Sequence, residues 1–86
     1  MSSIFYKAKP VEIEALEWKG SNIREMLEFY PEVVTEESDE GECLIKIETL
    51  EGVMTANVGD YIIKGTLGEY YPCKPEAFHN KYEVLK

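Results

Sequence analysis

The stretch that decides the fold is Val58-Gly59-Asp60-Tyr61-Ile62-Ile63-Lys64-Gly65, followed by Gly68-Glu69-Tyr70-Tyr71-Pro72-Cys73-Lys74-Pro75. Two short runs rich in β-branched and aromatic residues flank a tight turn at residues 65–68. This pattern predicts a β-hairpin, because glycine adopts the positive φ angles that tight turns require. Pro75 then favours the first turn of a helix, where no backbone N–H is needed. Hairpin geometry therefore explains these glycines without a ligand-cradling loop.

Three segments upstream have the period of two that is typical of strands with one buried face. In the first of them, Val11, Ile13 and Ala15 alternate with glutamates. The three segments are residues 5–15, 43–50 and 53–58, with Glu51-Gly52 as a two-residue turn between the last two. Val33 and Val34 begin a further strand in this interpretation, and residues 83–85 form a terminal one.

A short helix is predicted between the first two strands. Its apolar stripe recurs at i, i+3, i+4 and i+7 and consists of Ile23, Met26, Leu27 and Tyr30. Asn22 and Glu25 form a capping-box-like pair, with Ser21 as the competing cap, and Pro31 ends the helix. A second helical stretch, of one or two turns, follows Pro75 and carries Phe78 and Tyr82 on one face.

Without the segment that begins at Val33 and Val34, the predicted order is β-α-β-β-β-β, then a short C-terminal helical turn and a last strand. Consecutive hairpins predict a small twisted antiparallel sheet with one helix packed on its apolar face. With 86 residues, the chain is expected to form a single α+β domain spanning 1–86. A strongly coiled sheet, half closed to a barrel, is the alternative.

Charge narrows the class of partner. The chain has 17 acidic residues against 9 Lys and Arg and a formal net charge of −8. Direct nucleic-acid binding is not expected, because it needs clustered basic residues. The balance suits a basic protein partner or mimicry of a nucleic acid. The acidic run of residues 36–42 is expected to be a solvated loop or hairpin tip.

The sequence also limits compartment and chemistry. It shows no signal peptide, apolar span or lipidation motif, so we expect a cytoplasmic protein with no membrane contact. Cys43 and Cys73 are expected to be free thiols, and a disulfide between them is the alternative. In so small a domain a deep cleft is hard to build, so homo-oligomerisation also stays open.

Catalytic and metal sites are not expected. His79 is the only histidine, and no second residue stands beside it as an acid–base partner. Together with two cysteines it gives fewer ligands than the four of a structural zinc site. We therefore expect a protein that is not an enzyme and has no catalytic residues, metal or cofactor.

Aromatic and charged residues near the turns are the candidate binding surface. Tyrosine and tryptophan combine a large contact area with a polar tip. The surface consists of Trp18, Asp60, Tyr61, Lys64, Tyr70, Tyr71 and Lys74, with Lys19 beside it. Strand alternation places Tyr70 and Tyr71 on opposite faces, one in the core and the other more exposed. The alternative is that these aromatic residues are simply the core of a small domain.

The segment from Leu50 to Leu85 resembles a group of short phage and prophage proteins of unknown role that carry a Pro-Gly-Asp-Tyr-Gly motif. The similarity lies in residues 59–65 and 68–75, together with Phe78 and Tyr82, and residues 11–18 look like the usual opening of these proteins. The chain departs from the motif at Val58, where the motif has proline, and at Ile62, where it has glycine. The resemblance implies a phage or prophage gene expressed in a bacterial cytoplasm and brings no known activity.

These observations predict a small non-enzymatic binding protein of phage or prophage type, which acts on a host protein or small ligand in counter-defence or host takeover. One alternative is a structural or assembly accessory protein of a phage. The other is an acidic nucleic-acid mimic that uses residues 36–42 and the outward Glu12 and Glu14 as phosphate substitutes.

Overall fold

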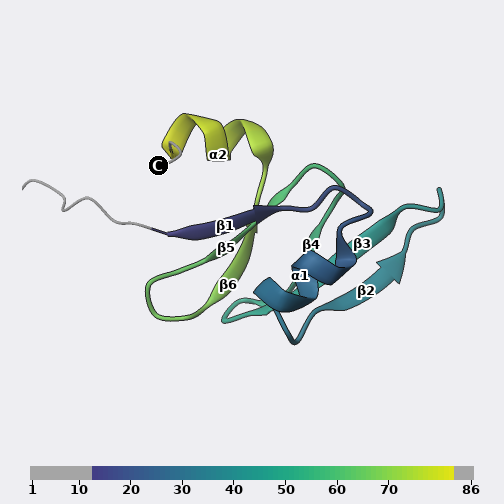
Figure 1. Ribbon diagram of the computed structural model, residues 1–86, viewed down its shortest axis with the longest axis horizontal. Coiled ribbons are helices and arrows are strands. Elements are labelled where there is room, and N and C mark those ends of the chain that lie inside the picture. The colour runs from purple at the N-terminus through teal and green to yellow at the C-terminus, as the bar shows by residue number, and fades with distance from the viewer. Residues whose placement is uncertain (1–12, 83–86) are drawn as a thin grey trace, which may run out of the picture.

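The computed structural model describes residues 13–82. In this range the chain forms two antiparallel sheets of three strands each and two short helices (Figure 1). The elements are β1 (Glu14–Glu17), α1 (Ile23–Phe29), β2 (Val34–Glu37), β3 (Cys43–Thr49), β4 (Gly52–Ala56), β5 (Tyr61–Lys64), β6 (Tyr70–Cys73) and α2 (Pro75–Lys81).

The predicted α+β class is confirmed, but the strands divide between two sheets instead of sharing one. β2, β3 and β4 form a meander joined by hairpins, whereas β1 pairs with the distant β5, which in turn pairs with β6. β6 lies against β3 and β4, so the two sheets share one core. The period of two in a strand shows which side chains share a face, but it does not identify the partner strand.

The central strand β5 is covered on both faces. Ile62 and Ile63 are both buried, although neighbouring residues of a strand point to opposite sides. Ile62 faces the shared core, together with its register partner Leu16. Ile63 faces the other way, on the side where α2 lies against the first sheet (Figure 1). This second layer makes β5 the most deeply buried strand of the first sheet.

The core is built around tryptophan and isoleucine side chains, and α1 contributes only part of its predicted stripe. Met26 and Tyr30 are buried, but Ile23 and Leu27 are exposed, while Phe29 packs partly against the core. A seven-residue helix turns a narrow face to the core. The buried apolar residues are Trp18, Met26, Tyr30, Ile45, Ile47, Ala56, Ile62 and Ile63.

Asn22 occupies the predicted N-cap position, but its side chain makes no capping hydrogen bond. Its Oδ1 accepts a hydrogen bond from the Lys19 backbone N–H at 2.9 Å, and its Nδ2 donates to Glu17 O and Glu25 Oε1. The residue therefore fastens the loop between β1 and α1, and Glu25 is its partner as the capping-box pattern suggested.

The turns lie where the glycines predicted them, except that the β3–β4 turn lies one residue earlier in the chain. Leu50 and Glu51 occupy the β3–β4 turn, and Gly52 opens β4 with a φ of +115°. The two turn residues thus precede the predicted Glu51-Gly52 pair by one position, because the positive φ is needed after the turn. Residues 38–42 form the tip of the β2–β3 hairpin, as predicted, but Glu36 and Glu37 of the predicted loop are part of strand β2.

Some predictions fall outside residues 13–82. The start of the first predicted strand, with Val11 and Glu12, and the terminal strand at 83–85 lie there. Inside the described range, neither helix is long and apolar enough to cross a membrane.

Candidate functional site

The predicted binding residues do not form one surface, and Trp18 is the clearest correction. Its side chain is fully buried, and its indole Nε1 donates a 2.7 Å hydrogen bond to the Cys43 carbonyl across the two sheets. A large aromatic residue with its N–H satisfied inside is a core residue. Trp18 therefore cannot contact a partner in this conformation.

Asp60 is the second correction, because its side chain is buried as well, at 4% exposure. Its Oδ2 accepts a 2.9 Å hydrogen bond from the Asn57 backbone N–H and lies 3.1 Å from Lys74 Nζ. Gly59 N donates to Trp18 O, and Trp18 N donates to Asp60 O. Asp60 thus holds the turn that leads into β5, and we call its contacts with Asn57 and Lys74 the Asp60 clamp.

Tyr61 and Tyr71 lie on the face of the first sheet that α2 covers. The Tyr61 ring stacks on Phe78 with centroids 4.0 Å apart, and its hydroxyl lies 3.4 Å from His79 Nε2. Burial, followed by a hydrogen bond with Tyr82, raises the pKa of Tyr71 to about 12. Both tyrosines serve chiefly to fix α2 to the sheet.

Tyr70 and Lys64 face the opposite side, as their register pairing requires. The predicted separation of Tyr70 from Tyr71 is therefore confirmed. The Tyr70 ring packs against the core beside Phe29 and Tyr30, and its hydroxyl donates a 2.8 Å hydrogen bond to the Phe29 carbonyl. Of the predicted residues, Tyr70 alone also lines a groove between the two sheets and the end of α1.

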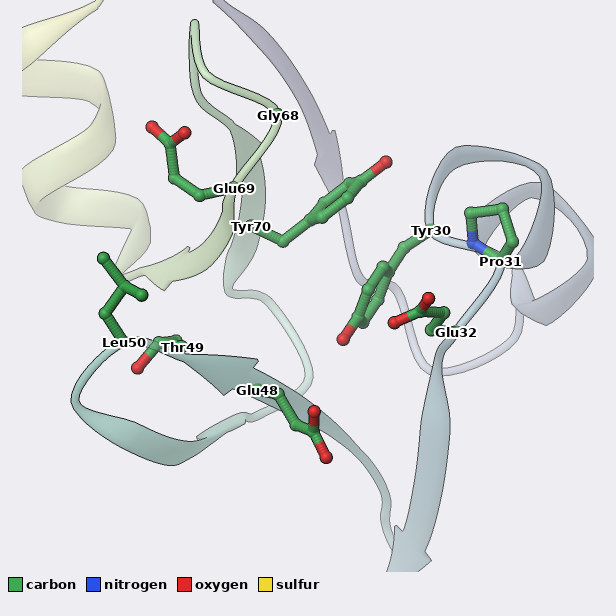
Figure 2. Close-up of a pocket in the computed structure, with 9 residues that line it drawn as sticks. All are labelled: Tyr30, Pro31, Glu32, Glu48, Thr49, Leu50, Gly68, Glu69 and Tyr70. Carbon is green, nitrogen blue, oxygen red and sulfur yellow. The ribbon is translucent and has the colours of Figure 1, made fainter.

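This groove, of about 540 Å³, opens where the end of α1, the end of β3 and the start of β6 meet (Figure 2). We call it the Tyr30 groove. Its walls combine two tyrosines, three glutamates and one leucine with backbone from two turns: Tyr30, Tyr70, Glu32, Glu48, Glu69 and Leu50.

Tyr30 is the residue that distinguishes the groove from an ordinary surface hollow. Its side chain is buried, with 5% of the residue exposed, and its ring packs on Tyr70 with centroids 4.4 Å apart. Within residues 13–82 its hydroxyl has no hydrogen-bond partner, yet it is not shut off from solvent. Figure 2 shows this hydroxyl directed toward β3, on the side of Glu32 and Glu48.

The three glutamates are not equivalent. Glu32 and Glu48 line the groove on the side to which the Tyr30 hydroxyl points in Figure 2, whereas the Glu69 carboxylate points away from it. Glu69 folds over Gly65, at a place where any Cβ would collide with its carboxylate. The groove is thus lined by carboxylates, which accept hydrogen bonds, and by the Tyr30 hydroxyl, which can accept or donate one.

From the sequence these groove residues could not be recognised. Tyr30 had the position of a core residue in a helical stripe, and Glu48 that of an outward strand residue. Only the meeting of two sheets and a helix brings them together.

The described part of the chain offers little for other kinds of chemistry. Across residues 13–82, no three His, Cys, Asp or Glu side chains are grouped so that they could hold a metal ion. Cys43 and Cys73 are free thiols and lie in different sheets. His79 is exposed and contacts Tyr61 and Phe78.

No protein-family model, curated protein or solved structure matches this chain significantly.

Proposed function

We propose that the protein acts by binding a partner protein in the Tyr30 groove, and that it works as a non-catalytic effector. The observation that carries this proposal is the Tyr30 hydroxyl, which has no partner in the described chain although the side chain that bears it is buried. A hydroxyl that is open to solvent at the end of a buried ring, inside a concave site, is suited to hydrogen-bond a ligand.

Charge and surroundings support the same proposal. A net charge of −8 increases the encounter rate with a basic partner. Leu50, on the rim of the groove, is fully exposed at 103% and offers apolar contact area. An acidic groove with an apolar rim resembles the polar and apolar mixture of protein interfaces.

The setting is part of the proposal and is supported by sequence resemblance alone. The tail of residues 50–85 resembles phage and prophage proteins, so we propose a host protein as the partner and a bacterial cytoplasm as the compartment. Interference with a host factor, in counter-defence or takeover, is the corresponding role.

The proposal is tested with two charge-reversed variants that change net charge equally. Glu32→Lys with Glu48→Lys alters the groove, and Glu37→Lys with Glu40→Lys alters the exposed β2–β3 hairpin as the matched control. Tagged wild type and both variants are incubated with bacterial lysate, and retained proteins are identified by mass spectrometry. We expect a partner that wild type and the control retain and the groove variant loses.

Two outcomes would contradict the proposal. Absence of any specifically retained protein would argue against a binding function. If the hairpin control lost the partner while the groove variant retained it, the binding site would lie on the acidic hairpin. That result would favour the nucleic-acid mimic instead.

A further inference from the structure

We propose that the Tyr30 groove recognises the cationic end of an arginine or lysine side chain in a basic segment of the partner. This inference rests on the proposed function and names the chemistry of its site. The described groups that meet in the groove are acceptors, and its nine lining residues include no lysine, arginine or histidine.

The donor requirement follows from the hydrogen-bonding state of the two tyrosines. Tyr70 donates its hydroxyl proton to the Phe29 carbonyl at 2.8 Å, so that hydroxyl already has an internal partner. The Tyr30 hydroxyl has none among residues 13–82, and its oxygen is free to accept. An N–H group in the groove would therefore find this oxygen in a site that Glu32 and Glu48 also line.

A cation satisfies this arrangement better than a neutral donor. Ionised carboxylates only accept hydrogen bonds, whereas an ammonium has three donors and a guanidinium has five. Hydrogen bonds between charged partners are roughly twice as strong as neutral ones. Lys46 on β3 is already engaged by Glu36 at 3.1 Å and by Thr55. Lys64 is the register partner of Tyr70 but does not line the groove.

The rim favours a protein segment over a free amine. Leu50 lies in the β3–β4 turn, and Leu67 lies next to Gly68 in the β5–β6 turn; their exposures are 103% and 92%. Two exposed leucines on turns that border one groove add apolar contact area beside the acidic site. A peptide can present a cation and apolar side chains together, and a volume of about 540 Å³ exceeds the need of a single ammonium group.

The test uses peptides of defined sequence and isotope-labelled protein. The probe is acetyl-Leu-Arg-Leu-Arg-Leu-amide, and the control peptide carries citrulline, a neutral analogue of arginine, in both arginine positions. Backbone amide shifts map the site, and titrations give Kd values. We expect the arginine peptide to shift the amides of Glu32, Glu48 and Leu50, and the citrulline peptide to bind at least tenfold more weakly.

Matched variants separate the site from general charge. Tyr30→Phe and Glu48→Gln are each expected to weaken arginine-peptide binding roughly tenfold. Tyr61→Phe and Glu40→Gln make the same chemical changes outside the groove and are expected to leave Kd within about twofold. If the thermal unfolding midpoint of Tyr30→Phe equals that of the wild type, the loss of peptide binding does not come from a loss of folding.

Three results would overturn the inference. If the citrulline peptide bound as tightly as the arginine peptide, recognition would not depend on a positive charge. If Glu40→Gln weakened binding as much as Glu48→Gln, the binding would be non-specific charge attraction. Spermidine binding as tightly as the arginine peptide would make the ligand a free amine. A lysate partner that still depends on the groove would, in any of these cases, leave the proposed function intact.

Discussion

Two residues of this small domain, Asp60 and Tyr30, are nearly buried and carry a polar group, and they differ in where the hydrogen bonds of that group go. In the Asp60 clamp, the carboxylate of Asp60 is satisfied by Asn57 N and Lys74 Nζ from the same chain. In the Tyr30 groove, the hydroxyl of Tyr30 has no partner within residues 13–82. The hydrogen bonds of Asp60 stay inside the fold and stabilise it, whereas the Tyr30 hydroxyl is reached by solvent and can hydrogen-bond a ligand.

The comparison reverses the expectation from sequence. The residues around Gly59 and Asp60 looked like a binding surface, because charged and aromatic side chains cluster there. They prove to hold the turn before β5 and to fix α2. The groove consists mostly of residues that had seemed ordinary. Four predictions sharpen this difference.

Trp18→Ala is expected to have the largest effect on the free energy of unfolding. Trp18 is fully buried and bridges the two sheets, so truncation leaves a cavity that costs about 3–5 kcal/mol. Urea unfolding followed by far-UV circular dichroism measures this loss. Trp18→Phe, which keeps an aromatic ring, serves as the control and should lose less. A change below about 1 kcal/mol for Trp18→Ala would contradict a structural role for this residue.

Asp60→Ala should destabilise the protein by about 1–3 kcal/mol, because it removes the acceptor that holds Asn57 N and Lys74 Nζ. Asp39→Ala, in the exposed β2–β3 turn, is the matched control and should stay within about 0.5 kcal/mol. Urea midpoints compare the two, and arginine-peptide titration of folded Asp60→Ala should give the wild-type Kd. If Asp60→Ala had the wild-type urea midpoint but bound the arginine peptide more weakly, Asp60 would belong to the binding surface after all.

Tyr70→Phe and Tyr30→Phe compare the hydroxyls of two rings that pack against each other. The Tyr70 hydroxyl has a partner inside the fold, whereas the Tyr30 hydroxyl has none within residues 13–82. Tyr70→Phe loses a hydrogen bond to the Phe29 carbonyl and should cost about 0.5–1.5 kcal/mol. Tyr30→Phe removes a hydroxyl without a partner in the described chain and should stay within about 0.5 kcal/mol. Thermal and urea unfolding measure both. If Tyr30→Phe were the more destabilising of the two, the hydroxyl would have a structural partner, and the proposed site would lose its main support.

The smallest effect is expected at high pH and concerns Tyr71. Because its pKa is raised from 10.0 to about 12, the folded state keeps a proton that the unfolded state releases between these values. This contribution to stability is complete below pH 10.0 and is lost as pH rises through about 12. Since the phenol is half-buried, the effect should be below about 1 kcal/mol.

Urea midpoints of wild type and Tyr71→Phe across this pH range measure the effect, and the variant should show the flatter decline. Tyr61→Phe is the control on the same face. Parallel declines in wild type and Tyr71→Phe would show that Tyr71 does not titrate differently in the folded state.

Local features of the fold were predictable because their causes are local. Gly68, with a φ of +83°, makes the turn between β5 and β6, and Pro75 begins α2. Alternation placed Tyr70 and Tyr71 on opposite faces, as found. The stripe of α1 was only half right, because the seven-residue helix buries Met26 and Tyr30 but leaves Leu27 exposed.

The sequence by itself determined the class of this protein: the alternating strands, the glycine turns, the short helices and an acidic surface all follow from neighbours in the chain. The tertiary structure alone decided that β1 pairs with β5, that Trp18 and Asp60 are interior, and that Tyr30, Glu32 and Glu48 meet. The physical reason is that periodicity assigns a side chain to a face, whereas a site depends on which faces pack together across long separations in the chain.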